Sequence, residues 1–202
     1  MKNRFYLLTV AFLLFFCSGA GKKESPPVEI LSDGSMAATT VFSRDVNLSE
    51  IKLPAGFSIS VFAEVEDARS MTVSPAGTVF VGNRNSSSVY ALQDMDRDGK
   101  ADKKWMIASG LNMPNGVAFR DGDLYVAEVS RIIKFKNIES SLAKPVKPEV
   151  VYDQYPSETW HGAKYIAFGP DNKLYIPVGA PCNVCDKGAS LFATITRINP
   201  DG

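Results

Sequence analysis

The chain has 202 residues, of which 45% are hydrophobic and 22% are charged, and its 22 basic and 22 acidic residues leave it without net charge. This balance is typical of a globular protein with an ordinary core, and it lacks the basic excess of a nucleic-acid-binding protein. Neutrality also gives no electrostatic reason to expect binding to a membrane surface or to an anionic substrate.

The N-terminal segment 1–20 has the pattern of an export signal. Two basic residues precede an apolar run at 5–16, which is shorter than the roughly 20 residues that span a bilayer and fits the core of a secretion signal. Residues 18–20 fit ordinary cleavage, whereas residues 14–17 resemble a bacterial lipoprotein box in which Cys17 is lipidated. We favour the lipoprotein, so we expect a periplasmic or outer-membrane protein whose membrane attachment runs only through that lipid.

The stretch 21–48 is rich in Lys, Ser and Pro and predicts a disordered linker. Ordered structure is expected to begin near Ile51, within a domain at 49–202. The first predicted strand is Ser58–Ala63, where polar and apolar residues alternate.

A repeat then occupies the rest of the chain. Each copy has an apolar strand, a turn containing Gly, Asp or Asn, and a return strand, and the period is 45 to 50 residues. This period, with about four short strands per copy, is typical of a β-propeller blade. The residues from 49 onward suffice for about three blades, whereas closed propellers have about 4 to 8. We therefore predict an all-β propeller truncated to about three blades. The copies are 71–81, 116–126 and 165–176, and further strands are expected at 88–92, 131–135 and 193–198.

The third copy carries the most distinctive residues. His161, the single histidine of the chain, comes just before its hairpin, and Cys182 and Cys185 come just after it. Both places lie at the same end of a hairpin, so we expect the histidine and the cysteine loop to be neighbours. Imidazole titrates near neutrality and can act as a general base, although a histidine that only bonds a backbone carbonyl at a strand end has the same sequence signature.

An acidic segment between two predicted strands resembles the first part of a calcium-binding loop. Carboxylates stand at Asp94, Asp96, Asp98 and Asp102, with glycine in the sixth position. The twelfth position is Trp105, where a bidentate Glu is usual, and a solvated acidic turn without metal is the alternative. A bound ion here would be structural.

Two further features have competing interpretations. Cys182 and Cys185 have a redox spacing, but no βαβ pattern surrounds them, so we predict a local disulfide outside the cytoplasm. Arg84 follows a predicted strand and can bind a cofactor carboxylate, or it is a solvated loop residue.

Several strings of the domain, from about Ile51 to the last residue, resemble the glucose/sorbosone dehydrogenases. The most specific string is HGAKYIAFGPDNKLYIPVGAPCNVC, and GLNMPNGVAFRDGDLYVAE and ITRINPDG add to it. That family consists of exported six-bladed propellers that oxidise sugars with pyrroloquinoline quinone and calcium. The resemblance implies that His161 is the catalytic base, and that most quinone and calcium ligands lie in later blades.

The resulting hypothesis is the N-terminal part of an exported quinoprotein that oxidises a sugar or aldose hydroxyl, with a small-molecule sugar as substrate and no nucleic-acid partner. The expected cofactors are pyrroloquinoline quinone and calcium; the sequence does not identify the electron acceptor. The alternative is a non-catalytic cell-surface propeller that binds a protein or a glycan.

Overall fold

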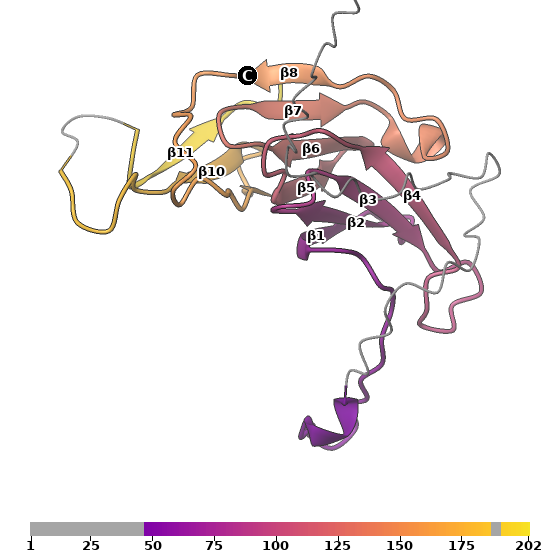
Figure 1. Cartoon of the computed structure of the whole chain (residues 1–202). Coiled ribbons are helices and arrows are strands. Elements are labelled where there is room, and N and C mark those ends of the chain that lie inside the picture. Colours follow the sequence, from indigo (N-terminus) through magenta and orange to yellow (C-terminus); the bar gives the residue numbers. More distant parts are fainter. Residues whose placement is uncertain (1–46, 187–190) are drawn as a thin grey trace, which may run out of the picture.

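The computed structural model describes residues 47–186 and 191–202, which fold into antiparallel sheets with two short 3-10 segments. Each sheet is an up-and-down meander, and the three sheets follow one another along the chain (Figure 1). The predicted fold class is confirmed: the sheets are successive propeller blades. The first sheet contains β1 (Ala68–Val73), β2 (Val79–Asn83), β3 (Val89–Gln93) and β4 (Lys103–Ala108); the second contains β5 (Gly116–Arg120), β6 (Asp123–Ala127), β7 (Ile132–Phe135) and β8 (Glu149–Tyr152); the third contains β9 (Ala167–Phe168), β10 (Leu174–Val178) and β11 (Thr194–Ile198); the 3-10 segments are η1 (Leu48–Glu50) and η2 (Ile138–Ser141).

The second sheet is buried on both faces. Along β6, Leu124 and Val126 belong to a core cluster shared with the first sheet, while Tyr125 and Ala127 belong to a cluster shared with the third. Successive side chains of a strand point to opposite faces, so this one strand contributes to two cores. Burial of each large apolar side chain contributes about 1.5–3 kcal/mol, which makes these two interfaces the main source of cohesion.

The predicted repeat coincides with the observed hairpins. The three copies correspond to β1–β2, β5–β6 and β9–β10, and the predicted additional strands correspond to β3, β7 and β11. Left-handed backbone at Gly77, Gly122 and Asn172 completes the tight turn of each hairpin, as their residue types predict.

The predicted strand Ser58–Ala63 is wrong. This segment has no strand assignment, and the neighbouring side chains of Phe57, Ile59 and Val61 are exposed. A backbone hydrogen bond of 2.8 Å from Ala101 N to Phe62 O ties it to the first sheet. Alternation alone does not make a strand, because a strand also needs a partner for its ladder, so the first sheet begins instead at β1.

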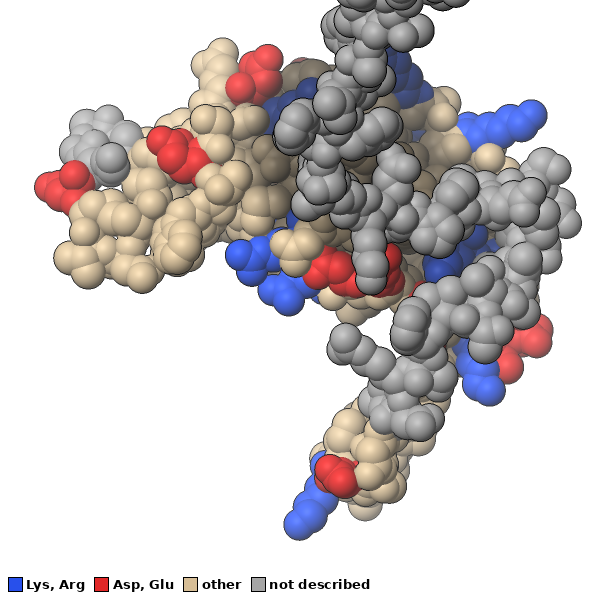
Figure 2. Space-filling model, in the orientation of Figure 1, with Lys and Arg blue, Asp and Glu red and all other residues tan. Residues whose placement is uncertain are grey.

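The predictions for residues 1–20, including Cys17, and for nearly all of the linker lie outside the described residues. Within the described part of the chain, no helix has the length and apolar character needed to cross a membrane. Acidic and basic side chains are interspersed on the face shown in Figure 2, in keeping with the zero net charge.

Candidate functional site

Most of the candidate residues lie along one edge of the three sheets, the edge formed by strand ends. In each sheet the first strand begins where the second strand ends, as the pairs Ala68–Asn83 and Gly116–Ala127 show. The connections between sheets, residues 109–115 and 153–166, therefore run along this edge, which we call the rim. Arg84 follows β2 at the rim, and His161 lies in the second connection.

Polar contacts tie neighbouring sheets together at the rim. The Ser70 hydroxyl on β1 donates to the backbone oxygen of Asn115, just before β5. The Asn115 side chain in turn donates to the backbone oxygen of Lys164, ahead of β9, at 2.7 Å. Backbones approach so closely here that a Cβ on Gly82 would lie 2.4 Å from the Asn115 oxygen. The rim is thus a packed, hydrogen-bonded structure.

The turn that carries His161 holds its imidazole in a defined orientation. His161 has a left-handed backbone, with φ of 52°, and its side chain is exposed. Its Nδ1 lies 2.9 Å from the backbone oxygen of Ala180, in the loop after β10. A carbonyl oxygen can only accept a hydrogen bond, so Nδ1 carries the hydrogen, and in the neutral imidazole the lone pair is then on Nε2. The neutral side chain can therefore accept a proton at Nε2.

The expected proximity of the histidine and the cysteine loop is present in the structure. Besides the bond to Ala180, a Cβ on Gly179 would lie 2.2 Å from the backbone oxygen of His161, so glycine is needed for this approach. Cys182 and Cys185 form a disulfide with a Cα–Cα distance of 6.0 Å. The bridge closes a short ring in the same loop that accepts the histidine hydrogen bond.

Arg84 lies at the rim with an exposed side chain. Its loop is wrapped around Asp67: the backbone N–H of Asn85, together with those of Ser86 and Arg84, lowers the pKa of the Asp67 carboxyl below its ordinary value. Among the described residues, none hydrogen-bonds to the Arg84 guanidinium or pairs with it. The guanidinium is therefore available to an anionic group.

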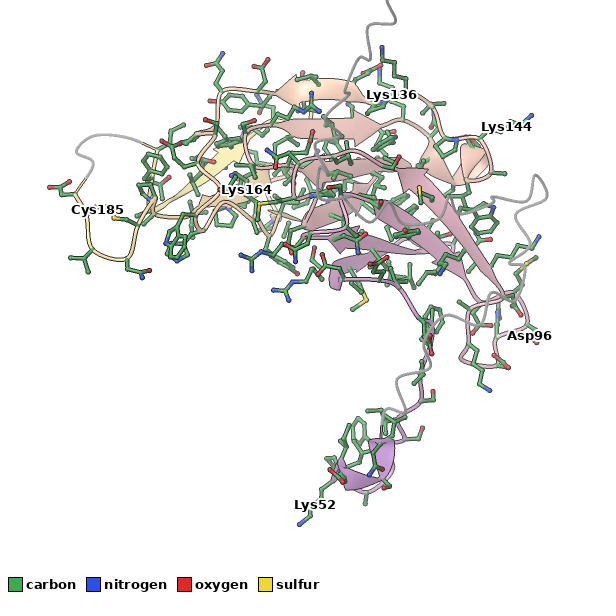
Figure 3. All side chains as sticks on the ribbon, viewed as in Figure 1. Lys52, Asp96, Lys136, Lys144, Lys164 and Cys185 are labelled. Carbon is green, nitrogen blue, oxygen red and sulfur yellow. A yellow bond between two sulfur atoms is a disulfide. The ribbon has the colours of Figure 1, made fainter. Side chains whose placement is uncertain are left out.

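The acidic loop lies at the opposite edge of the first sheet. It joins the end of β3 to the start of β4, and β3 ends beside the start of β2, away from the rim; Figure 3 shows Asp96 far from Lys164. Carboxylate oxygens of Asp94, Asp96 and Asp102 lie within 4.8 Å of one another. Asp98 is outside that group, and its carboxylate accepts a hydrogen bond from Lys100 N at 2.8 Å. An ion here would stabilise the loop without reaching the rim.

A family model described as "Domain of unknown function (DUF7133)" matches residues 43–202. The chain belongs to this family. A protein of Borreliella burgdorferi described as uncharacterized is 24% identical over an alignment of 167 residues that covers 74% of this chain and 40% of that protein.

Solved structures of propellers show the same fold. The aldose sugar dehydrogenase of Streptomyces coelicolor, bound to pyrroloquinoline quinone, gives a TM-score of 0.55 at 22% identity and covers 71% of this chain. The holo pyrroloquinoline quinone domain of Coprinopsis cinerea pyranose dehydrogenase gives 0.50 at 10% identity and covers 58%. The chain spans 48% and 29% of those two structures, respectively.

Two buried charged residues at the rim were not predicted from the sequence. Glu128, only 3% exposed, accepts hydrogen bonds from Asn112 N and from the Arg131 guanidinium. Lys164 is 2% exposed, and its burial lowers its pKa to about 8. Glu128 directly follows the apolar residues 124–127, so its position at a strand end could have marked it as a candidate site residue. Nothing in the local sequence distinguishes Lys164 from a surface lysine.

Proposed function

We propose that this chain contributes the catalytic base to an exported oxidoreductase that oxidises a hydroxyl group of a sugar. The observation that carries the proposal is the orientation of His161: its Nδ1 is engaged by the Ala180 carbonyl at the rim, which leaves Nε2 free to accept a proton. The fold shared with sugar dehydrogenases supports the substrate class. The chain spans 48% of the Streptomyces structure, so the activity is proposed for the whole protein and not for these blades alone.

An aromatic surface beside the histidine supports a sugar as the substrate. The Trp160 side chain is 57% exposed, and its ring centroid lies 5.5 Å from that of the His161 imidazole. An exposed indole offers an apolar face against which the C–H groups of a sugar ring can pack, while its N–H can meet a hydroxyl. In this arrangement Trp160 orients the sugar and His161 removes the hydroxyl proton.

Pyrroloquinoline quinone can bind at the rim through Arg84. The Arg84 guanidinium is available for a cofactor carboxylate, and such pairs are often bidentate. When bound, the quinone supplies the acceptor for the two electrons of the oxidation. Calcium is proposed with it, separate from any ion in the acidic loop.

Dye reduction tests the proposed function. The protein, in the longest form that its gene encodes, is supplied with pyrroloquinoline quinone, calcium and a panel of aldoses. His161→Gln should lower kcat by about 10²- to 10⁴-fold, the contribution of a positioned base, and Trp160→Ala should mainly raise KM. Lys144→Met, at an exposed lysine, serves as the control. Wild-type turnover in the His161 variant would refute the base, whereas no dye reduction by the wild-type protein would favour a propeller that only binds a protein or a glycan.

A further inference from the structure

Lys164 is a buried lysine without a carboxylate partner. Its side chain is 2% exposed, although lysine is almost never fully buried unless it is paired. Within the part of the chain that the structure describes, no ion pair includes it. The Tyr155 ring, whose centroid lies 5.5 Å from the ammonium, packs against it. An apolar residue of the same length would avoid the cost of burying a cation, so the ammonium must make specific contacts that such a residue cannot.

The ammonium bridges the second sheet and the histidine turn. Its Nζ donates to the backbone oxygen of Val129, which follows β6, and to the backbone oxygen of Gly162 at 3.3 Å. Gly162 is the residue directly after His161, and its N–H closes the turn by donating to Thr159 O at 2.9 Å. One side chain therefore holds the histidine turn against the neighbouring blade.

The backbone of the same residue is fixed to the second sheet as well. The Asn115 side chain donates to the Lys164 oxygen at 2.7 Å. The histidine turn is thus held by the second sheet through Lys164 and by the third sheet through Ala180. A non-glycine residue with positive φ, such as His161, is strained and needs surroundings that hold it there.

We propose that Lys164 is a positioning residue that fixes the orientation of the His161 imidazole by clamping its turn to the second blade. The inference rests on the proposed function of His161 as the base. Without the ammonium, the oxygens of Val129 and Gly162 lose a shared donor, the turn is released from the second blade, and the bond from Nδ1 to Ala180 is no longer enforced. The imidazole then samples both tautomers, and Nε2 carries a lone pair for only part of the time.

The single histidine of the sequence makes this directly measurable. With the imidazole neutral, ¹⁵N spectra of the wild-type chain should show one protonated nitrogen, Nδ1, and one bare nitrogen, Nε2, as two well-separated resonances. In Lys164→Met, of similar length but without donors, these resonances should converge, while backbone amide signals of the first sheet stay in place. The matched control Lys144→Met should leave the imidazole resonances unchanged. Unchanged imidazole resonances in a folded Lys164→Met chain would overturn the proposal.

A second measurement on the wild-type protein covers the case in which Lys164→Met does not fold. Acetylation of the native chain should modify the exposed Lys144 and leave Lys164 unmodified. Modification of both at the same rate would show that the clamp is absent. In the longest form of the protein, Lys164→Met should lower kcat with little change in KM. Converged imidazole resonances in a protein that reduces no dye would retain the clamp and reject the proposed function.

Discussion

Burial of Lys164 makes the stability of the domain depend on pH in an unusual direction. Burial lowers the pKa of this lysine from its ordinary 10.5 to about 8. Below pH 8 both the folded and the unfolded chain bind the proton, so folding bears the full cost of burying the charge. Between pH 8 and 10.5 the unfolded chain binds more protons than the folded one, so the free energy of unfolding rises with pH.

The magnitude follows from the two pKa values. The shift corresponds to about 3 kcal/mol over the whole window, of which about 2 kcal/mol is gained between pH 7 and 9.5. Measurements should stop there, because two tyrosines then oppose the trend. Burial raises the pKa of Tyr125 to about 12 and also raises the pKa of Tyr155, whose ring packs against Lys164. Above the ordinary tyrosine pKa of 10.0 the folded chain therefore binds more protons at these two residues than the unfolded chain, and the free energy of unfolding falls as pH rises.

Urea unfolding followed by tryptophan fluorescence, at intervals from pH 7 to 9.5, measures this gain. The wild-type chain and Lys144→Met should both become more stable by about 2 kcal/mol, since the exposed Lys144 has no part in the effect. Lys164→Met should lose the rise altogether. Equal pH dependence in the wild type and in Lys164→Met would refute the reasoning, because the buried ammonium would then not be the group that titrates.

Three further predictions concern other parts of the chain. Gly179→Ala places a Cβ 2.2 Å from the His161 oxygen, which should cost about 1–3 kcal/mol of stability and displace the histidine enough to lower kcat about 10²-fold. In the control Gly169→Ala, the new Cβ instead meets ring atoms of the Tyr175 side chain, which can move. Equal kcat in the two variants would contradict this prediction. Calorimetry should detect calcium uptake that Asp94→Asn weakens without loss of dye reduction, and absence of uptake by the wild type would exclude the ion. Labelling with a palmitate analogue should mark the protein and fail in Cys17→Ala; a mature N-terminus at residue 21 would indicate simple secretion instead.

The blade pattern was predictable because each hairpin carries its own local signals. In Leu124–Ala127 and Leu174–Val178, apolar residues of strand-forming types follow turn residues, and both stretches are strands. The same signals gave a wrong strand at Ser58–Ala63, where the alternation is equally clear. The difference lies in the partner: β6 and β10 each have a neighbour on both sides, whereas no strand of the described chain pairs with 58–63.

The candidate site was predictable only in part. The approach of His161 to the cysteine loop followed from hairpin geometry, because both lie at one end of β9–β10. The role of Lys164 could not be predicted, because its acceptor on Val129 is 35 residues away and is brought near only by the stacking of two blades. Burial between sheets, unlike alternation within a strand, leaves no local trace in the sequence.

The topology also separates His161 from the acidic loop. In a meander of this kind, the connections between blades and the loops after the second strands all return to the rim, while the hairpin turns and the loop of Asp94 lie at the other edge. The turns at Gly77 and Gly122 keep two of the hairpin connections at that edge short. The rim loops bring His161, an exposed indole and the guanidinium of Arg84 to one edge of the sheets. Substrate chemistry is therefore expected at the rim, and an ion bound by the acidic loop can influence it only through the stability of the first sheet.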